Sequence, residues 1–131
     1  NRVELIQDSC GAGQYRGGLG VNFEITMLED TFATTVCERT KLAPWGLNGG
    51  KEGLPNNCSI IYEDGTSKDV PKATRVPFSK GKKILLQCGG GGGYGNPDER
   101  NKEKVIDDYK QEYISKNYIE KYYPGVAKEI Q

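Results

Sequence analysis

The chain has 131 residues, enough for one domain with an apolar core, although only 35% of them are hydrophobic. Basic and acidic residues number 18 each, so a formal net charge of zero gives no electrostatic case for nucleic acid or an anionic membrane surface. The absence of histidine excludes Ser-His-Asp and Cys-His catalysis, and no apolar run approaches the roughly 20 residues of a membrane helix.

The start of the chain predicts a strand over residues 3–7 and carries no secretion signal. Residues 1–5 lack the basic region and apolar core of a signal peptide, so we expect a cytoplasmic protein. The chain has four cysteines, Cys10, Cys37, Cys58 and Cys88. Their number allows two disulfides, but in a reducing compartment we expect free thiols. Their spacing matches no zinc site, and we predict that this chain binds no metal.

A glycine-rich block over residues 8–20 comes next, with five glycines around Tyr15 and Arg16. Apolar and polar residues then alternate over residues 21–27 and again over 31–37, which predicts two strands. Arg16 and Arg39 lie in or near glycine blocks. Their guanidinium groups could bind a carboxylate or phosphate, or could anchor a loop to an acidic neighbour.

The second glycine block, residues 44–51, contains Trp45 and ends in a lysine. It fails as a phosphate-binding loop because three residues rather than four separate Gly46 from Gly50, and Glu52 follows Lys51 where Ser or Thr is needed. Further along, the pattern predicts strands over 58–62 and 83–88, with turns at residues 64–65 and 80–81.

The third block begins with five consecutive glycines, residues 89–93, followed by Tyr94-Gly-Asn-Pro. Glycine loses more backbone entropy on ordering than any other residue, so such a run predicts close approach of bare backbone or several positive φ angles. We expect Gly92 in particular to tolerate no Cβ, and we expect the glycine blocks to converge on one face. The alternative is a flexible linker.

The last part of the chain, residues 98–131, predicts a helical tail. Apolar residues at helical spacing mark a first helix between 105 and 114, and Ser115 can cap a second helix that Pro124-Gly125 ends. Its tyrosines are expected to serve packing. The sequence thus predicts a mainly β protein, with a sandwich-like or barrel-like body over residues 1–97 bearing long glycine-rich loops, and a short helical tail packed on the same domain.

The order and spacing of these blocks carry a resemblance to a known family. Residues 11–20, the pair Glu38-Arg39, residues 44–50 and residues 90–97 occur in this order, before a tyrosine-rich tail that ends in Pro-Gly-Val. This pattern resembles the C-terminal part of the hydantoinase B/oxoprolinase family, over nearly the whole chain.

The resemblance implies a part in the ATP-dependent hydrolysis of cyclic amides such as hydantoins or 5-oxoproline. It implies two partners, an actin-like ATPase of the hydantoinase A type and the rest of the B-type subunit. ATP, Mg and a divalent metal are then expected elsewhere in the full enzyme, with no cofactor on this chain. Catalytic residues are not identified, and the candidates for substrate binding or subunit contacts are Tyr15, Arg16, Arg39, Trp45, Gly91, Gly92, Gly93 and Tyr94.

The resemblance leaves alternatives open. Related proteins carboxylate ketones such as acetone or acetophenone, so a subunit of such a carboxylase is the second interpretation. A non-catalytic assembly module, whose glycine loops only contact partner subunits, is the third. We expect the chain, as a fragment or a naturally split small subunit, to be inactive alone, and we expect neither nucleic acid nor a membrane among its partners.

Overall fold

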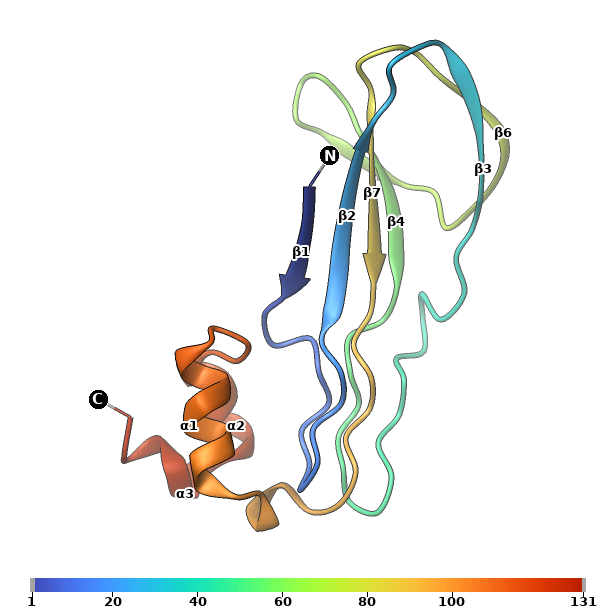
Figure 1. The fold of residues 1–131 in the computed structure, drawn as a ribbon. Helices are drawn as coiled ribbons and strands as arrows, with labels where there is room; N and C mark the ends of the chain where they lie inside the picture. The colour runs from blue at the N-terminus through green and yellow to red at the C-terminus, as the bar shows by residue number, and fades with distance from the viewer. Residues whose placement is uncertain (1, 131) are drawn as a thin grey trace.

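The computed structural model describes residues 2–130 and confirms a mainly β body followed by short helices (Figure 1). The larger sheet is antiparallel, with strand order β1-β2-β7-β4-β5, and β3 pairs with β6 in a smaller sheet. The strands span β1 Arg2–Ile6, β2 Gly20–Thr26, β3 Thr31–Val36, β4 Asn57–Ile61, β5 Ser67–Asp69, β6 Lys72–Phe78 and β7 Lys83–Cys88.

The body is an open sandwich rather than a closed barrel, because β1 and β5 form the two ends of the larger sheet. One apolar cluster lies between the two sheets. Phe78 from β6, Ile60 from β4 and Ile84 from β7 are buried in it, and Ala33 and Val76 pack against them from β3 and β6. Burial of these side chains holds the smaller sheet over the β4–β7 part of the larger one.

Two strands were not predicted from the sequence. β5 is a three-residue Ser-Lys-Asp strand with low β propensity, and its pairing follows from the predicted turn at Asp64-Gly65. β6 contains Pro77, which a central strand does not tolerate. It is accommodated because, among the strands of residues 2–130, β6 pairs with β3 alone and is therefore an edge strand. The register of this pair shifts between Ala33 and Thr35.

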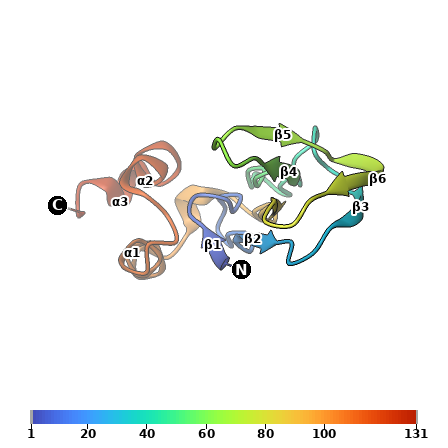
Figure 2. The same ribbon diagram turned by 90° about the horizontal axis from the view of Figure 1, so that it is seen from above.

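The helices lie to one side of the larger sheet, opposite the β3–β6 pair, as the view from above shows (Figure 2). A 3-10 turn, η1 Pro97–Glu99, leads into α1 Lys102–Lys110, α2 Lys116–Tyr122 and α3 Pro124–Ala127. Ser115 caps α2 as predicted, because its Oγ accepts from the Tyr118 N–H at 3.1 Å. Pro124 follows the end of α2 but also begins a further short helix, where its fixed φ suits the first turn.

The second apolar cluster lies between these helices and the first glycine block. Val105, Ile114, Ile119 and Val126 from the tail are buried in it, among other side chains, together with Cys10 from the block. No helix within residues 2–130 is long and apolar enough to cross a membrane.

Candidate functional site

The three glycine blocks lie side by side and form one feature, which we call the glycine layer: residues 9–20, 44–55 and 89–95. In Figure 1 they run as extended segments beyond the ends of β2, β4 and β7. The 89–95 segment is bonded to both others. Gly11 N–H donates to Gly91 O at 2.8 Å, and Gly93 N–H donates to Lys51 O at 2.9 Å. The first and second segments are also joined directly, since Lys51 N–H donates to Ala12 O at 2.7 Å.

The glycines of the layer are required because backbone packs directly on backbone. A Cβ on Gly92 would lie closer than 3.0 Å to the carbonyl of Trp45. A Cβ on Gly90 or Gly93 would clash in the same way, with the carbonyl of Ser9 or Ala12, respectively. None of residues 89–93 has a positive φ. Close approach is therefore the reason for the run, the predicted convergence is confirmed, and the linker interpretation is wrong.

Two phenols of the tail bond to the glycine layer. Tyr118 OH donates to the Cys10 carbonyl at 2.6 Å, and Tyr123 OH lies 3.2 Å from both the N–H and the carbonyl oxygen of Gly13. Burial raises the pKa of both phenols, and it also raises the pKa of the Cys10 thiol, 3.7 Å from the Tyr118 oxygen. The tyrosines therefore serve packing, as predicted, and they satisfy backbone groups of the layer as well.

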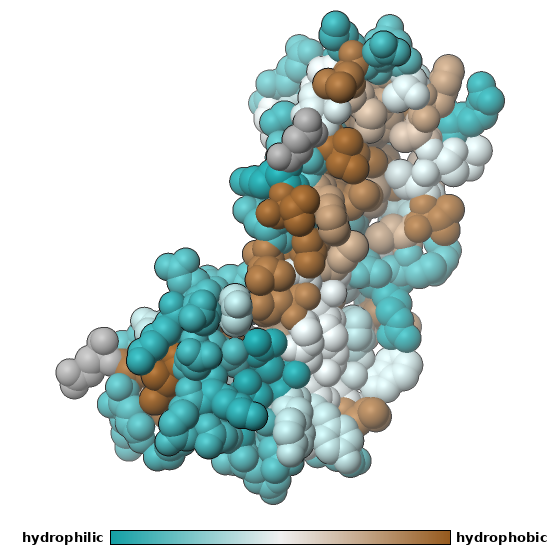
Figure 3. Space-filling view, in the orientation of Figure 1, coloured by the Kyte–Doolittle hydropathy of each residue, from teal (hydrophilic) through white to brown (hydrophobic). Residues whose placement is uncertain are grey.

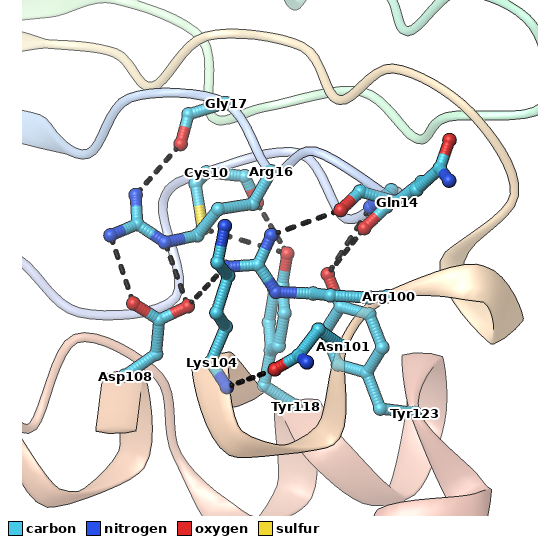
Figure 4. A network of polar contacts seen from close by, with 11 residues as sticks. Cys10, Gln14, Arg16, Gly17, Arg100, Asn101, Lys104, Asp108, Tyr118 and Tyr123 are labelled. Atoms are coloured by element: carbon cyan, nitrogen blue, oxygen red, sulfur yellow. Dashed lines mark hydrogen bonds and ion pairs between the residues drawn. The ribbon is translucent and has the colours of Figure 1, made fainter. Parts of the chain in front are cut away.

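A second link between the layer and the tail is a cluster of charges around Asp108 (Figure 4). Arg16 reaches both oxygens of Asp108 through Nε and Nη2, each at 2.9 Å, and Arg100 Nη2 donates to Oδ2 at 2.8 Å. Arg100 Nη1 also donates to the Gln14 carbonyl at 3.3 Å. The side chains of Asp108 and Arg100 are only 8% exposed, so these are buried, charge-assisted bonds.

Arg16 therefore anchors its loop to an acidic neighbour, one of the two roles that the sequence left open. Arg100 and Asp108 were missed by sequence reasoning. A signal for Asp108 was present, because it follows the buried Val105 by three residues and so lies on the apolar side of α1.

Tyr15 and Tyr94 meet at the end of the layer. Each donates its N–H to the other's carbonyl oxygen, at 2.9 and 2.8 Å, and their ring centroids are 6.4 Å apart. Asn48 Nδ2 donates to the Tyr94 hydroxyl at 2.6 Å. Both rings and the neighbouring Leu47 remain largely exposed. The layer thus presents an aromatic tip, made of Tyr15, Leu47 and Tyr94.

Arg39 and Trp45 meet at a groove. The guanidinium carbon of Arg39 lies 4.7 Å from the centre of the Trp45 ring, and Arg39 holds a positive φ of 53°. The groove has a volume of about 640 Å³ and is also lined by Lys41, Leu42 and Pro71. Because the Trp45 carbonyl faces Gly92, the groove lies on the glycine layer.

The candidate residues are thus gathered around one layer but turn to different surfaces: Tyr15 and Tyr94 to the tip, Arg39 and Trp45 to the groove, Arg16 to α1. Their roles remain predictions. All four cysteines are free, and residues 2–130 contain no group of three or more His, Cys, Asp or Glu side chains that could hold a metal ion.

The architecture defines a mainly β segment built around backbone-packed glycine strands and buttressed by helices. The protein-family model of Hydantoinase B/oxoprolinase matches residues 1–97 of the chain. The chain belongs to the hydantoinase B/oxoprolinase family.

Several relatives match most of the chain. It is 36% identical to the B-type subunit of a putative D-/L-hydantoinase from a Pseudomonas species and 32% identical to the beta subunit of the caprolactamase from Pseudomonas jessenii, over 88% of this chain in each case. An uncharacterized protein of Methanocaldococcus jannaschii is 39% identical over 85% of the chain. The chain spans only 20%, 21% and 20% of these relatives, respectively.

Two solved structures share the fold. The ATP-dependent caprolactamase of Pseudomonas jessenii superposes with a TM-score of 0.80 at 27% identity, covering 91% of this chain and 21% of that one. The nucleotide-free structure of an acetone carboxylase gives 0.73 at 19% identity, covering 92% of this chain and 20% of that one, a likeness of fold alone.

Proposed function

We propose that this chain is the C-terminal domain or small subunit of the B-type component of an ATP-dependent cyclic-amide hydrolase. The observation that carries the proposal is the likeness, over 88% of the chain, to the B-type polypeptide of a putative hydantoinase and to the beta polypeptide of a caprolactamase. The names of both relatives denote cyclic amides as substrates. A role in a ketone carboxylase has weaker support, since acetone carboxylase shares 19% identity and the fold only.

Within such an enzyme, the glycine layer would act as a rigid platform that positions contact residues. Its backbone groups are bonded to one another, and Arg16, Tyr118 and Tyr123 are engaged inside the molecule. The exposed groups are those of the tip and the groove, including Tyr15, Tyr94 and Trp45. Exposed, backbone-anchored aromatic side chains are typical of binding surfaces, because they bury a large area at low entropic cost.

The proposal assigns the remaining functions to other parts of the enzyme. The rest of the B-type subunit and an actin-like ATPase of the hydantoinase A type would be the partners. ATP, Mg and a divalent metal would bind to those parts, and this chain would contribute active-site loops or subunit contacts.

The test is reconstitution. The chain alone, the remaining B-type and A-type polypeptides without it, and all of them together are assayed with ATP for turnover of hydantoin, 5-oxoproline and caprolactam. We expect turnover of at least one cyclic amide by the complete mixture only. Turnover by the isolated chain above a heat-killed sample, undiminished turnover without it, or bicarbonate-dependent consumption of acetone instead would contradict the proposal.

A further inference from the structure

One face of the larger sheet is apolar from β1 to β4 but is covered over only part of that width. Residues paired across antiparallel strands share a face, and Val3 pairs with Phe23, which pairs with Leu86. Ile25 likewise pairs with Ile84, and Ile84 pairs with Ile60. The β3–β6 pair buries Ile60 and Ile84 at the β4–β7 end of this face. The β1–β2 end belongs to the same face and lies outside that cluster.

The uncovered part, which we call the β1–β2 apolar face, consists of Val3, Leu5, Val21, Phe23 and Ile25. Val3 is 68% exposed, Leu5 54% and Ile25 41%. Figure 3 shows the resulting band of apolar side chains over the β1–β2 part of the molecule. The other face of the same strands carries Arg2, Glu4 and Glu24, so the apolar surface follows the strand alternation. A contiguous apolar surface of this kind marks an interaction site.

The same region ends in a free strand edge. β1 pairs with β2 on one side, and within residues 2–130 no strand pairs with its other side. Alternate N–H and C=O groups of such a strand point away from its partner and can accept another strand. The charged side chains of β1 do not block this edge, because Arg2 and Glu4 lie on the opposite face and pair with each other at 3.2 Å.

We propose that the β1–β2 apolar face and the free edge of β1 dock the remainder of the B-type polypeptide, which adds a strand to β1 and covers Val3, Leu5 and Ile25. The inference rests on the proposed function. The occupant follows from the relatives, in which the matching segment is 20% of the hydantoinase polypeptide and 21% of the caprolactamase polypeptide, so that about four-fifths of each lies outside it. An uncharged, apolar surface suits a permanent contact of this kind.

A native thiol reports on this surface. Cys88 is exposed, and it lies on the apolar face because it pairs with Val21, which in turn pairs with Leu5. Cys10 and Cys58 are buried, and Cys37 is half-buried beside the groove. The rate of maleimide modification at Cys88, measured by mass spectrometry with and without the partner polypeptide, therefore reports whether the β1–β2 apolar face is covered.

The experiment co-purifies the full chain with the B-type polypeptide of the same source, expressed without this segment. The test variant carries Val3→Thr and Leu5→Thr, which keep strand-forming residues. The matched control carries Phe32→Thr and Val36→Thr, two apolar side chains of β3 that are also more than half exposed. We expect the unmodified chain and the control to bind, with Cys88 protected, and the test variant to bind about tenfold more weakly or worse, as the loss of buried apolar contacts predicts. Circular dichroism verifies that both variants are folded.

The outcomes separate the two proposals. If the unmodified chain does not bind the B-type polypeptide, the proposed function fails. If it binds, but Cys88 stays reactive and the test variant binds as well as the control, the docking surface is wrong and the proposed function stands. Protection of Cys88 by the ATPase polypeptide alone also overturns the assignment. Should the test variant unfold, the Cys88 protection of the unmodified chain decides.

Discussion

At the scale of single residues, Gly92 shows what the run of five glycines is for. Its backbone faces the Trp45 carbonyl, while Gly18, in the same layer, has open space where a Cβ would be. Replacing either glycine changes the conformational freedom of the backbone, but only at Gly92 does a new side chain meet a neighbouring segment. Comparing the two positions therefore distinguishes the entropic effect from the steric one.

We expect Gly92→Val to lower the free energy of unfolding by clearly more than the roughly 1 kcal/mol of an ordinary glycine change, or to abolish folding, because a Cβ displaces the neighbouring strand. Gly18→Val is the control and should stay near that ordinary value. Urea denaturation of both variants measures the difference. Equal midpoints would mean that the layer can adjust, and that close packing is not what selects glycine at position 92.

The two candidate arginines illustrate what the sequence could not resolve. Arg16 and Arg39 both lie in or near glycine blocks, and both fit anion binding or loop anchoring. The first is bonded to Asp108, which lies 92 positions further along the chain, and the second lies over Trp45 at an exposed groove. Such partners depend on how distant segments meet in space, which residue spacing does not reveal.

At the scale of elements, strands with alternating apolar and polar residues were predicted within one residue at either end, because the alternation has the two-residue period of a strand. β7 matches its predicted bounds, and β2 and β4 begin and end one residue early. β5 was missed because its residues have weak strand propensity, and β6 because Pro77 argues against a strand; pairing with β4 and β3, respectively, imposes the conformation. The convergence of the glycine blocks and the helical tail were both predictable, whereas the bonds from the tail to the glycine layer, such as those of Tyr118 and Asp108, were not.

The contact between α2 and the glycine layer makes stability depend on pH in alkaline solution. The folded state holds Tyr118 and Tyr123 with raised pKa values, because burial disfavours the phenolate. In the unfolded chain the tyrosine phenol ionises at about pH 10 and the cysteine thiol at about pH 8.5. Above those values the unfolded state binds fewer protons than the folded state, so the free energy of unfolding falls as pH rises.

We expect Tyr118→Phe to make that alkaline decline shallower, by up to about 1.4 kcal/mol per pH unit, because one buried ionisable proton is removed. At neutral pH the variant should be less stable by about 1 kcal/mol, since the Cys10 carbonyl loses its donor. Urea denaturation between pH 7 and about 10.5 measures both effects, with Tyr15→Phe, at an exposed position, as the control. An unchanged alkaline slope would show that the Tyr118 phenol ionises equally in both states.

At the scale of the whole molecule, the glycine layer joins two apolar clusters that share no side chain. One cluster lies between the sheets, and the other needs residues from both the layer and the tail, such as Cys10 and Ile119. The helices therefore have no complete core of their own. This arrangement supports the prediction that residues 98–131 belong to the same domain as the body.

Ending the chain at Pro97 tests that prediction. The truncation removes Tyr118, Tyr123 and Asp108, which bond to the layer, so Cys10 and Ala12 become exposed and Arg16 loses its partner. We expect amide hydrogen exchange of residues 89–95 to accelerate strongly. Without the tail, the layer no longer packs against an apolar cluster, so local opening of the layer costs less free energy. Amides of β4 and β7 that pack in the sheet cluster should retain more of their protection. If residues 89–95 keep their full protection in the truncated chain, the backbone bonds of the layer suffice to hold it, and the tail is a separate attachment.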